Sequence, residues 1–293
     1  MDWHGSGVSV MEMSHRSKEF MSIAEQAEKD FREFLHVPSN YQVFFFQGGA
    51  TMQFSAIPYN LLRNKEKAGY ITTGAWSESA FKEAQKLCTP VEAWPDHKQQ
   101  FNTIPDPETW VIDKEAAYFH YCDNETIHGV EFKDFPFEKV EGLEVICDMS
   151  SNIGTRPIAW EKYGVVYAGS QKNLGPSGVC VVVVREDLIG HQRKDTPILF
   201  DWKLFAAAPS KMHNTPSCWP IYVTGLNLAH MKAKGLAHYQ DLANQRASML
   251  YDYIDGSEGY YTNPVDPRYR SRTNIPFRVK KDDKLETKFL KEA

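Results

Sequence analysis

Six short runs of apolar residues recur along the chain and constrain the fold more than any other feature. Several are rich in β-branched or aromatic residues without polar alternation, which is typical of strands buried on both faces of a sheet. The runs span residues 41–46, 69–73, 117–122, 143–147, 164–168 and 179–184. Helix-like stretches separate or follow them at 52–62, where we expect an interruption at Pro58, at 77–87 and at 225–254. This alternation predicts an α/β fold with a mainly parallel sheet covered by helices.

The length of the chain, 293 residues, fits one large domain or two unequal ones. A change in composition falls near residue 256, where helical sequence gives way to Gly256-Ser257-Glu258-Gly259 and then to a Pro- and Arg-containing stretch. We therefore expect a large domain over residues 1–256. Residues 257–293 are too few to build an independent core, and we expect them to be the beginning of a small α/β domain.

Composition excludes several classes of protein. The net charge of −5, from 33 Lys+Arg and 38 Asp+Glu, argues against a nucleic-acid binder, and no apolar run approaches the ~18 residues of a membrane span. The start, Met1–Gly5, lacks the basic and apolar regions of a secretory signal. Five dispersed cysteines without a C-x-x-C pair indicate reduced thiols, with neither a disulfide framework nor a metal site. We predict a cytoplasmic protein without nucleic-acid or membrane partners.

Residues that directly follow the predicted strands are the candidates for chemistry, because ligands bind at the carboxyl ends of strands in open α/β sheets. Gly48-Gly49-Ala50-Thr51 follows the first run and opens a predicted helix, whose free N–H groups can hold a phosphate. Trp76 follows the second run and can stack on a flat ring, and His128 follows the third. Each of these features, taken alone, is also compatible with a purely structural role.

A carboxylate and a lysine follow two consecutive strands. Asp148 comes directly after the run 143–147, and Lys172 follows the run 164–168. A buried carboxylate needs a cationic partner, and an isolated lysine is usually a solvated surface residue. Together with Trp76 and the phosphate-binding turn, the two residues match the requirements of pyridoxal 5′-phosphate: a lysine for the Schiff base, a carboxylate for the pyridinium nitrogen, a stacking ring and a phosphate site.

The chain resembles the phosphoserine aminotransferase family, collinearly from about Gly5 onward. The motifs that carry the resemblance are Glu12-Met13-Ser14-His15-Arg16-Ser17, Gln47-Gly48-Gly49, Thr73-Gly74-Ala75-Trp76-Ser77, Asn124-Glu125-Thr126-Ile127-His128-Gly129-Val130-Glu131-Phe132, Cys147-Asp148-Met149-Ser150-Ser151-Asn152, Gly169-Ser170-Gln171-Lys172-Asn173, Asn214-Thr215-Pro216 and Asn274-Ile275-Pro276-Phe277-Arg278. The resemblance implies a fold-type I, class V aminotransferase that works as a homodimer.

The resemblance also implies a role for each cofactor-site residue. Lys172 would carry pyridoxal phosphate covalently, and Asp148 would keep the pyridine nitrogen protonated. Trp76 would stack on the ring, Thr126 would hydrogen-bond the ring hydroxyl, and Gln171 would hold the phosphate.

Further phosphate contacts are implied from two other segments. The backbone at Ala50 and Thr51 would contact the phosphate, and Asn214 and Thr215 would reach it from the partner subunit. Dimerisation would then be part of cofactor binding.

The reaction implied is transfer of the amino group of L-glutamate to 3-phosphohydroxypyruvate, which yields O-phospho-L-serine and 2-oxoglutarate in serine biosynthesis. The related 4-phosphohydroxythreonine reaction of vitamin B6 synthesis is a second implied activity. His15 and Arg16 are implied as substrate-side residues, since a guanidinium fork suits a carboxylate or phosphate.

The sequence departs from the family pattern in two places. Many relatives have more glycine in the Gly48–Gly49 turn, and bacterial ones have an arginine where Thr51 stands. The family pattern also extends beyond both ends of this chain. On the C-terminal side it includes a His-Arg pair and a further arginine that grip the substrate, and no residue after Lys281 can replace them. We therefore expect a chain shortened at both ends.

These departures leave alternatives open. One is a catalytically impaired subunit that binds the cofactor or dimerises without the substrate clamp. Another is a different class V aminotransferase of the alanine–glyoxylate or serine type. The least favoured is an RNA binder built on the basic stretch from Arg268 to Arg278, which the acidic balance of the chain opposes.

Overall fold

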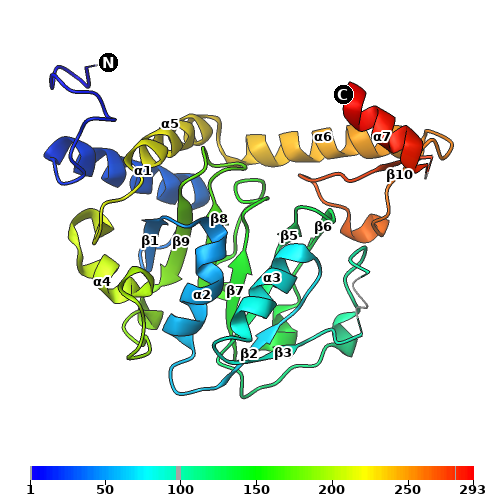
Figure 1. The fold of residues 1–293 in the computed structure, drawn as a ribbon, viewed down its shortest axis with the longest axis horizontal. Coiled ribbons are helices and arrows are strands. Elements are labelled where there is room, and N and C mark those ends of the chain that lie inside the picture. Colours follow the sequence, from blue (N-terminus) through cyan, green and yellow to red (C-terminus); the bar gives the residue numbers. More distant parts are fainter. Residues whose placement is uncertain (1, 97–99, 281) are drawn as a thin grey trace.

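A seven-stranded sheet forms the middle layer of the computed structural model, which describes residues 2–96, 100–280 and 282–293 (Figure 1). The strands lie in the order β1-β9-β8-β7-β4-β2-β3. Their bounds are Tyr41–Phe46 (β1), Lys67–Tyr70 (β2), Thr89–Glu92 (β3), Tyr118–Cys122 (β4), Glu144–Asp148 (β7), Val165–Gly169 (β8) and Cys180–Arg185 (β9). The pairs β2–β3, β2–β4, β4–β7 and β7–β8 are parallel, whereas β9 is antiparallel to both of its neighbours. The predicted α/β fold with a mainly parallel sheet is confirmed.

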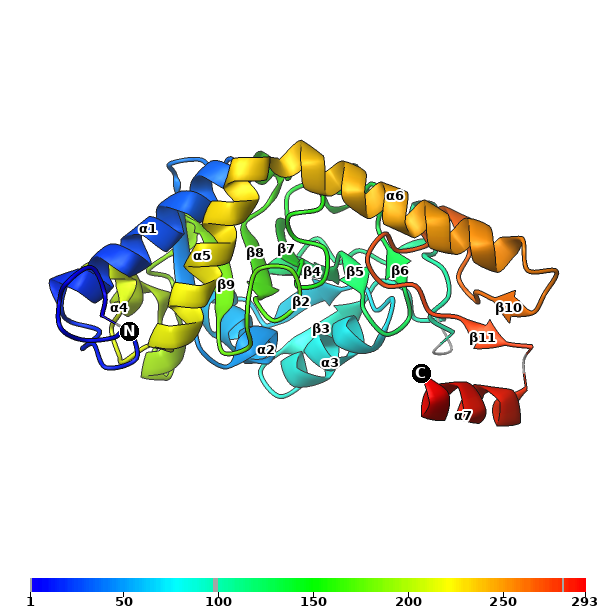
Figure 2. The same cartoon turned by 90° about the horizontal axis from the view of Figure 1, so that it is seen from above.

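Helices cover both faces of this sheet. The helices are Lys18–Leu35 (α1), Gly49–Leu61 (α2), Ala75–Ala84 (α3), Trp202–Ala207 (α4), Cys218–Lys234 (α5), Leu236–Asp255 (α6) and Asp283–Glu292 (α7). Helices α2, α3 and α4 pack on one face, and α1 and α5 lie side by side on the other (Figures 1 and 2). Figure 2 shows α6 running from the end of α5 toward the C-terminal segment.

Strand β9 explains why a continuous apolar run is needed in the sheet. Cys180, Val182 and Val184 pack among the side chains of the α2 and α3 layer, whereas Val181 and Val183 pack toward α1 and α5. All five are buried. Since each face of the strand lies against a helical layer, neither face tolerates the polar residues of an alternating pattern.

Helix α1 is amphipathic and has defined ends. Ser17 is the N-cap, and its side chain accepts a hydrogen bond from the Phe20 backbone N–H at 3.2 Å. His36 ends the helix in the left-handed conformation. The apolar residues of α1 recur at helical spacing and face the sheet, which buries Phe20, Phe31 and Leu35.

Two expectations about helices need correction. Helix α2 is not interrupted at Pro58: the helix continues to Leu61, and the N–H of Leu62 donates to the Pro58 carbonyl at 3.2 Å. A proline costs about 3 kcal/mol inside a helix, and burial of this helix against the sheet offsets that cost. The predicted helical stretch 225–254 is divided between α5 and α6, because Gly235 has a φ of 83°.

The segment after α6 forms a small antiparallel pair, Tyr261–Thr262 (β10) with Arg278–Val279 (β11), followed by α7. It is tied to a second hairpin, Asn124–Glu125 (β5) with Val130–Glu131 (β6), through an ion pair of 2.6 Å between Arg272 and Glu131. The boundary at residue 256 stays a prediction. In the described part of the chain, no helix has the length and apolar character to span a membrane.

Candidate active site

Three parallel strands bring the predicted cofactor residues together. Strands β4, β7 and β8 end at Cys122, Asp148 and Gly169, at the same edge of the sheet. A cavity of about 120 Å³ opens at this edge. Its lining includes seven of the predicted site residues: Ala50, Thr51, Trp76, Thr126, Asp148, Gln171 and Lys172.

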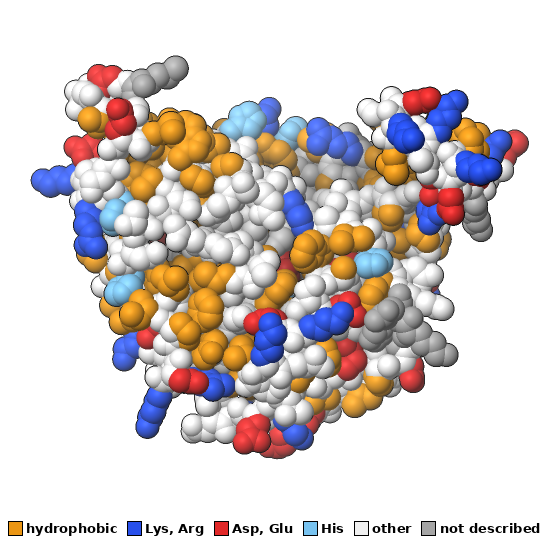
Figure 3. All heavy atoms as spheres, viewed as in Figure 1, with side chains coloured by type: hydrophobic (Ala, Val, Ile, Leu, Met, Phe, Trp, Pro, Cys, Tyr) orange, Lys and Arg blue, Asp and Glu red, His pale blue; other side chains and the backbone are white. Residues whose placement is uncertain are grey.

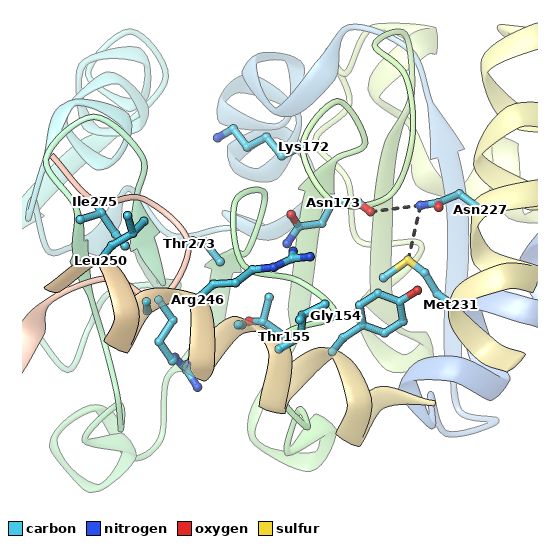
Figure 4. A pocket seen from close by; sticks show the side chains of 15 residues that line it. Gly154, Thr155, Lys172, Asn173, Asn227, Met231, Arg246, Leu250, Thr273 and Ile275 are labelled. Carbon is cyan, nitrogen blue, oxygen red and sulfur yellow. Dashed lines mark hydrogen bonds between the residues drawn. The ribbon is translucent and has the colours of Figure 1, made fainter. Parts of the chain in front are cut away.

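Lys172 is the centre of this group. Its side chain is exposed, and Nζ donates a hydrogen bond of 2.6 Å to Thr126 Oγ1 and lies 5.7 Å from the centre of the Trp76 ring. The loop that carries Lys172 is held from α5, since the side-chain amide of Asn227 donates to the Asn173 carbonyl at 3.1 Å (Figure 4). The lysine side chain is therefore accessible at the cavity, whereas a hydrogen bond from α5 anchors the loop that carries it.

Asp148 lies at the buried end of the cavity. It is 4% exposed, and its Oδ1 accepts the backbone N–H of Ser150 at 2.8 Å. Burial raises the pKa of Asp148 above its ordinary value, although hydrogen bonds from Ser150 and the charge of Lys172 oppose this shift. Within residues 2–96, 100–280 and 282–293, no cation forms an ion pair with Asp148. The carboxylate can therefore accept a cationic partner from a ligand.

The beginning of α2 provides a site for an anion. Gly48 and Gly49 both have positive φ, 78° and 62°, and α2 begins at Gly49 without a side-chain cap. Free backbone N–H groups and the positive end of the helix dipole therefore face the cavity beside Ala50 and Thr51. A phosphate fits this arrangement.

A buried carboxylate to which no sequence pattern assigned a role fixes the position of Trp76. Glu125 accepts the backbone N–H groups of Trp76 and Ser77, at 3.0 and 2.9 Å, and so satisfies the free donors at the beginning of α3. Gly74 is required here, because a Cβ on it would lie 2.4 Å from the Glu125 side chain. Burial raises the pKa of Glu125, and its hydrogen bonds from Ser77 and Trp76 oppose that change. His128 belongs to the same support, since its Nδ1 accepts the Ala75 N–H at 3.3 Å.

Four predicted site residues do not line the cavity. His15 and Arg16 precede α1, and the Nε2 atom of His15 is buried without a hydrogen-bond partner in the described part of the chain. Asn214 and Thr215 lie beside the turn before α2: Asn214 Nδ2 is 3.5 Å from Gln47 Oε1, and Gln47 donates to the Thr215 carbonyl at 3.2 Å.

A second, larger cavity of about 440 Å³ adjoins the first, with Lys172 lining both (Figure 4). It lies between α6 and the loop at residues 272–275, and two arginines, Arg246 and Arg272, are among its lining residues. Arg272 is ion-paired with Glu131 at 2.6 Å, whereas Arg246 forms no ion pair with another described residue, so this cavity offers one unneutralised guanidinium to an anion.

Comparison with known proteins places the chain in a family. The model of the class-V aminotransferases matches residues 1–293, so the chain belongs to that class. The chain is 47% identical over 294 residues to phosphoserine aminotransferase 2, chloroplastic, of Arabidopsis thaliana, covering all of this chain and 69% of the relative. It is also 47% identical over 293 residues to phosphoserine aminotransferase of Laribacter hongkongensis, 80% of which is covered. The chain belongs to the phosphoserine aminotransferase family.

A solved structure agrees with this assignment. PLP-bound phosphoserine aminotransferase from Trichomonas vaginalis superposes with a TM-score of 0.92 at 37% identity. The superposition covers 98% of this chain and 81% of that one.

Proposed function

We propose that this chain is a pyridoxal-phosphate-dependent transaminase that moves the amino group of L-glutamate to 3-phosphohydroxypyruvate, with O-phospho-L-serine and 2-oxoglutarate as products. The observation that carries the proposal is the convergence of Lys172, Asp148, Trp76 and Thr126 on one cavity beside the beginning of α2. The named relatives are phosphoserine aminotransferases, which supports this choice over other class V activities.

The residues present fit the cofactor. Asp148 is a buried carboxylate without an ion-pair partner in the described residues, and a protonated pyridine nitrogen would supply that partner. The uncapped N-terminus of α2 matches the phosphate, with Gln171 beside it, and the indole of Trp76 is 36% exposed at the cavity, where a ring can stack. Thr126 offers a hydroxyl to the ring oxygen.

When bound, pyridoxal phosphate accepts the electron pair released from the substrate α-carbon. The role of the protein's own residues is to hold and move protons. The amine of Lys172 takes the proton from the α-carbon of the amino donor and returns a proton to the α-carbon of the product. Asp148 keeps a proton on the ring nitrogen, which strengthens the ring as an acceptor of electrons. Thr126 orients this amine, because its Oγ1 accepts a hydrogen bond of 2.6 Å from Lys172 Nζ.

We extend the proposal to a homodimer in which the partner subunit completes each site. His15, Arg16, Asn214 and Thr215 lie outside the cavity lining of their own chain, which supports a contribution to the partner's site. Figure 3 shows hydrophobic side chains gathered at the surface of the part of the molecule that holds α4 and α5. The exposed large hydrophobic residues in and beside these two helices are Ile198, Leu199, Leu204, Trp219 and Leu226. Such a patch is typical of an interface.

The absorption spectrum of the purified protein tests the cofactor assignment. Wild-type protein supplied with pyridoxal phosphate is expected to show the visible band of the lysine-bound cofactor, and Lys172→Ala is expected to lose it. Lys203→Ala, which removes another exposed lysine, is the control and should keep the band. A colourless wild type, or a band that survives in Lys172→Ala, would overturn the proposal. A band that glutamate does not change would indicate an impaired subunit that binds cofactor without turnover.

A further inference from the structure

A row of buried polar side chains leads away from Asp148 beneath the cavity. Asp148 and Tyr167 are register partners on the neighbouring strands β7 and β8, so their side chains lie on the same face of the sheet. On β4, His120 lies on that face too, and its Nε2 is 2.8 Å from the Tyr167 hydroxyl. Tyr167 is fully buried and His120 is 2% exposed. The proposed mechanism gives neither residue a role.

We propose that His120 and Tyr167 form a directional hydrogen-bonded chain, His120 Nε2–H to Tyr167 Oη–H to the Asp148 carboxylate, which orients this carboxylate and keeps it ionised beneath the cofactor ring. His120 and Tyr167 are positioning residues in this scheme, because they act through Asp148. The inference rests on the proposed function in one respect: Asp148 is taken as the partner of the ring nitrogen.

The donor and acceptor roles in this hydrogen-bonded chain follow from the partners that each atom has. His120 Nδ1 is buried without a hydrogen-bond partner in the described part of the chain. If the imidazole proton were on Nδ1, it would be a buried N–H without an acceptor, and Nε2 would compete with Asp148 for the single tyrosine proton. With the proton on Nε2, Tyr167 is free to donate to the carboxylate, and a hydrogen bond to an ionised group is the stronger one.

Burial keeps His120 and Tyr167 in the protonation states that this donor-to-acceptor order requires. Burial lowers the pKa of His120 to about 3, so the imidazole is neutral, and burial raises the pKa of Tyr167, so the phenol stays protonated. In this arrangement Ser150, Lys172 and, as a smaller contribution, a hydrogen bond from Tyr167 lower the pKa of Asp148 and so oppose the effect of burial.

Some of the other groups around Asp148 favour its ionised form, and others oppose it. Lys172 and the donors of Ser150 favour the carboxylate form. The remaining ionisable neighbours whose charged forms interact unfavourably with an ionised Asp148 are Glu125, Cys122, Cys147 and Cys180. The thiol pKa values are raised by burial, so Glu125 is the main opposing group. Tyr167 is thus one of few groups that hold Asp148 ionised before cofactor binds.

Titration of Asp148 in the cofactor-free protein tests the hydrogen-bonded chain. Carbon-13 NMR of aspartate-labelled protein gives the ionisation midpoint, and Asp148→Asn assigns the signal. We expect Tyr167→Phe to raise the midpoint by about one pH unit, the equivalent of one lost hydrogen bond to a charged group. Tyr118→Phe is the matched control: Tyr118 is a fully buried tyrosine on the same face that bonds Tyr70 at 2.7 Å, and its loss should leave the midpoint unchanged.

The histidine is tested by a pair of variants. His120→Gln, whose amide can still donate to Tyr167, should keep the Asp148 midpoint near the wild-type value, whereas His120→Leu should raise it. If Tyr167→Phe does not fold, the difference between the Asp148 midpoints of His120→Gln and His120→Leu tests the proposal instead. In the cofactor-loaded protein, the pH at which cofactor affinity falls on acidification should rise with the Asp148 midpoint in Tyr167→Phe.

Two results would overturn the inference. One is an Asp148 midpoint that Tyr167→Phe leaves in place or shifts no further than Tyr118→Phe does. The other is equal midpoints in His120→Gln and His120→Leu. The NMR titration needs no cofactor, so a colourless wild-type protein would refute the proposed function and leave this titration decisive for the hydrogen-bonded chain.

Discussion

The ion pair between Arg272 and Glu131 gives the sharpest prediction about stability. Glu131 is fully buried. Its Oε1 lies 2.6 Å from a guanidinium nitrogen of Arg272, and its Oε2 lies 2.9 Å from Lys133 Nζ. The same pair attaches the segment after α6 to the β5–β6 hairpin, next to the loop that carries Thr126. We therefore choose Arg272→Met, which keeps an unbranched side chain and removes the charge.

The magnitude follows from the pKa of Glu131. Burial raises this pKa, but the hydrogen bonds and charges of Arg272 and Lys133 outweigh burial and lower it to about 2, from an ordinary 4.5. At 1.36 kcal/mol per pKa unit, that difference is about 3 kcal/mol. Removing one partner of a buried pair costs about 3–5 kcal/mol in general. Because Lys133 still contacts Glu131, we expect Arg272→Met to lower the free energy of unfolding by about 2–3 kcal/mol at neutral pH.

The pH dependence has a definite sign. A carboxyl group whose pKa is lower in the folded state stabilises the protein above its unfolded pKa, and this stabilisation is lost as the pH falls through the folded value. The contribution of Glu131 in the wild type is therefore present above about pH 4.5 and is lost toward pH 2. The difference in stability between wild type and Arg272→Met should shrink over that range.

Urea unfolding at neutral pH measures the effect. The control is Arg278→Met, which removes an arginine that is 52% exposed and pairs with Glu286 and Asp283 at the surface. It should lower the free energy of unfolding far less than Arg272→Met does, because exposed ion pairs contribute little to stability. An Arg272→Met variant within 1 kcal/mol of wild type, or equal in cost to Arg278→Met, would show that this pair does not anchor the segment.

Three further substitutions have expected outcomes. Asp148→Ala should weaken pyridoxal phosphate binding by at least about tenfold in an absorbance titration, since a charge-assisted bond is lost, and unchanged affinity would contradict its proposed role. Gly74→Ala places a Cβ 2.4 Å from the Glu125 side chain and should displace Trp76, so the same titration should show weaker binding; wild-type affinity would mean that this contact relaxes freely. Gly129 has a φ of 68°, and the Cβ of Gly129→Ala would lie 2.3 Å from the Pro276 side chain. This substitution should lower the free energy of unfolding by at least about 1 kcal/mol in urea, and no loss would count against the packing of this hairpin.

Much of the fold could be predicted because burial on both faces of a strand leaves a local pattern. The runs at 41–46 and 179–184 became β1 and β9 almost residue for residue. Two features left no such pattern. A continuous apolar run indicates burial but not direction, so the antiparallel orientation of β9 could not be predicted from it. The edge strand β3 is four residues long and contains a proline, which hides it among loops.

The helices show a limit of local propensity. Pro58 predicted an interruption that does not occur, because packing of α2 against the sheet outweighs one lost hydrogen bond. Helix α1, which was not predicted, has an N-cap at Ser17 and a regular apolar spacing from Phe20 onward, so its signal was present in the sequence.

The candidate site also contains residues whose roles could be predicted from the sequence and residues whose roles could not. Asp148 and Lys172 could be predicted to meet because the ends of parallel strands share one edge. Glu125 was part of a recognised motif, but its role depends on a contact with α3 across 48 residues of sequence, which no local pattern encodes. The pairing of Glu131 with Arg272 spans 141 residues, and only the folded chain brings them together.

The central claim is that the Lys172 site catalyses transamination between glutamate and a phosphorylated 2-oxo acid. Its most direct test is a single turnover in two stages. Protein loaded with pyridoxal phosphate is treated with L-glutamate, freed of small molecules, and then given 3-phosphohydroxypyruvate. We predict loss of the visible band with one 2-oxoglutarate formed per site, then return of the band with one O-phospho-L-serine formed per site. A loaded protein whose spectrum and products do not change at either stage would contradict the account.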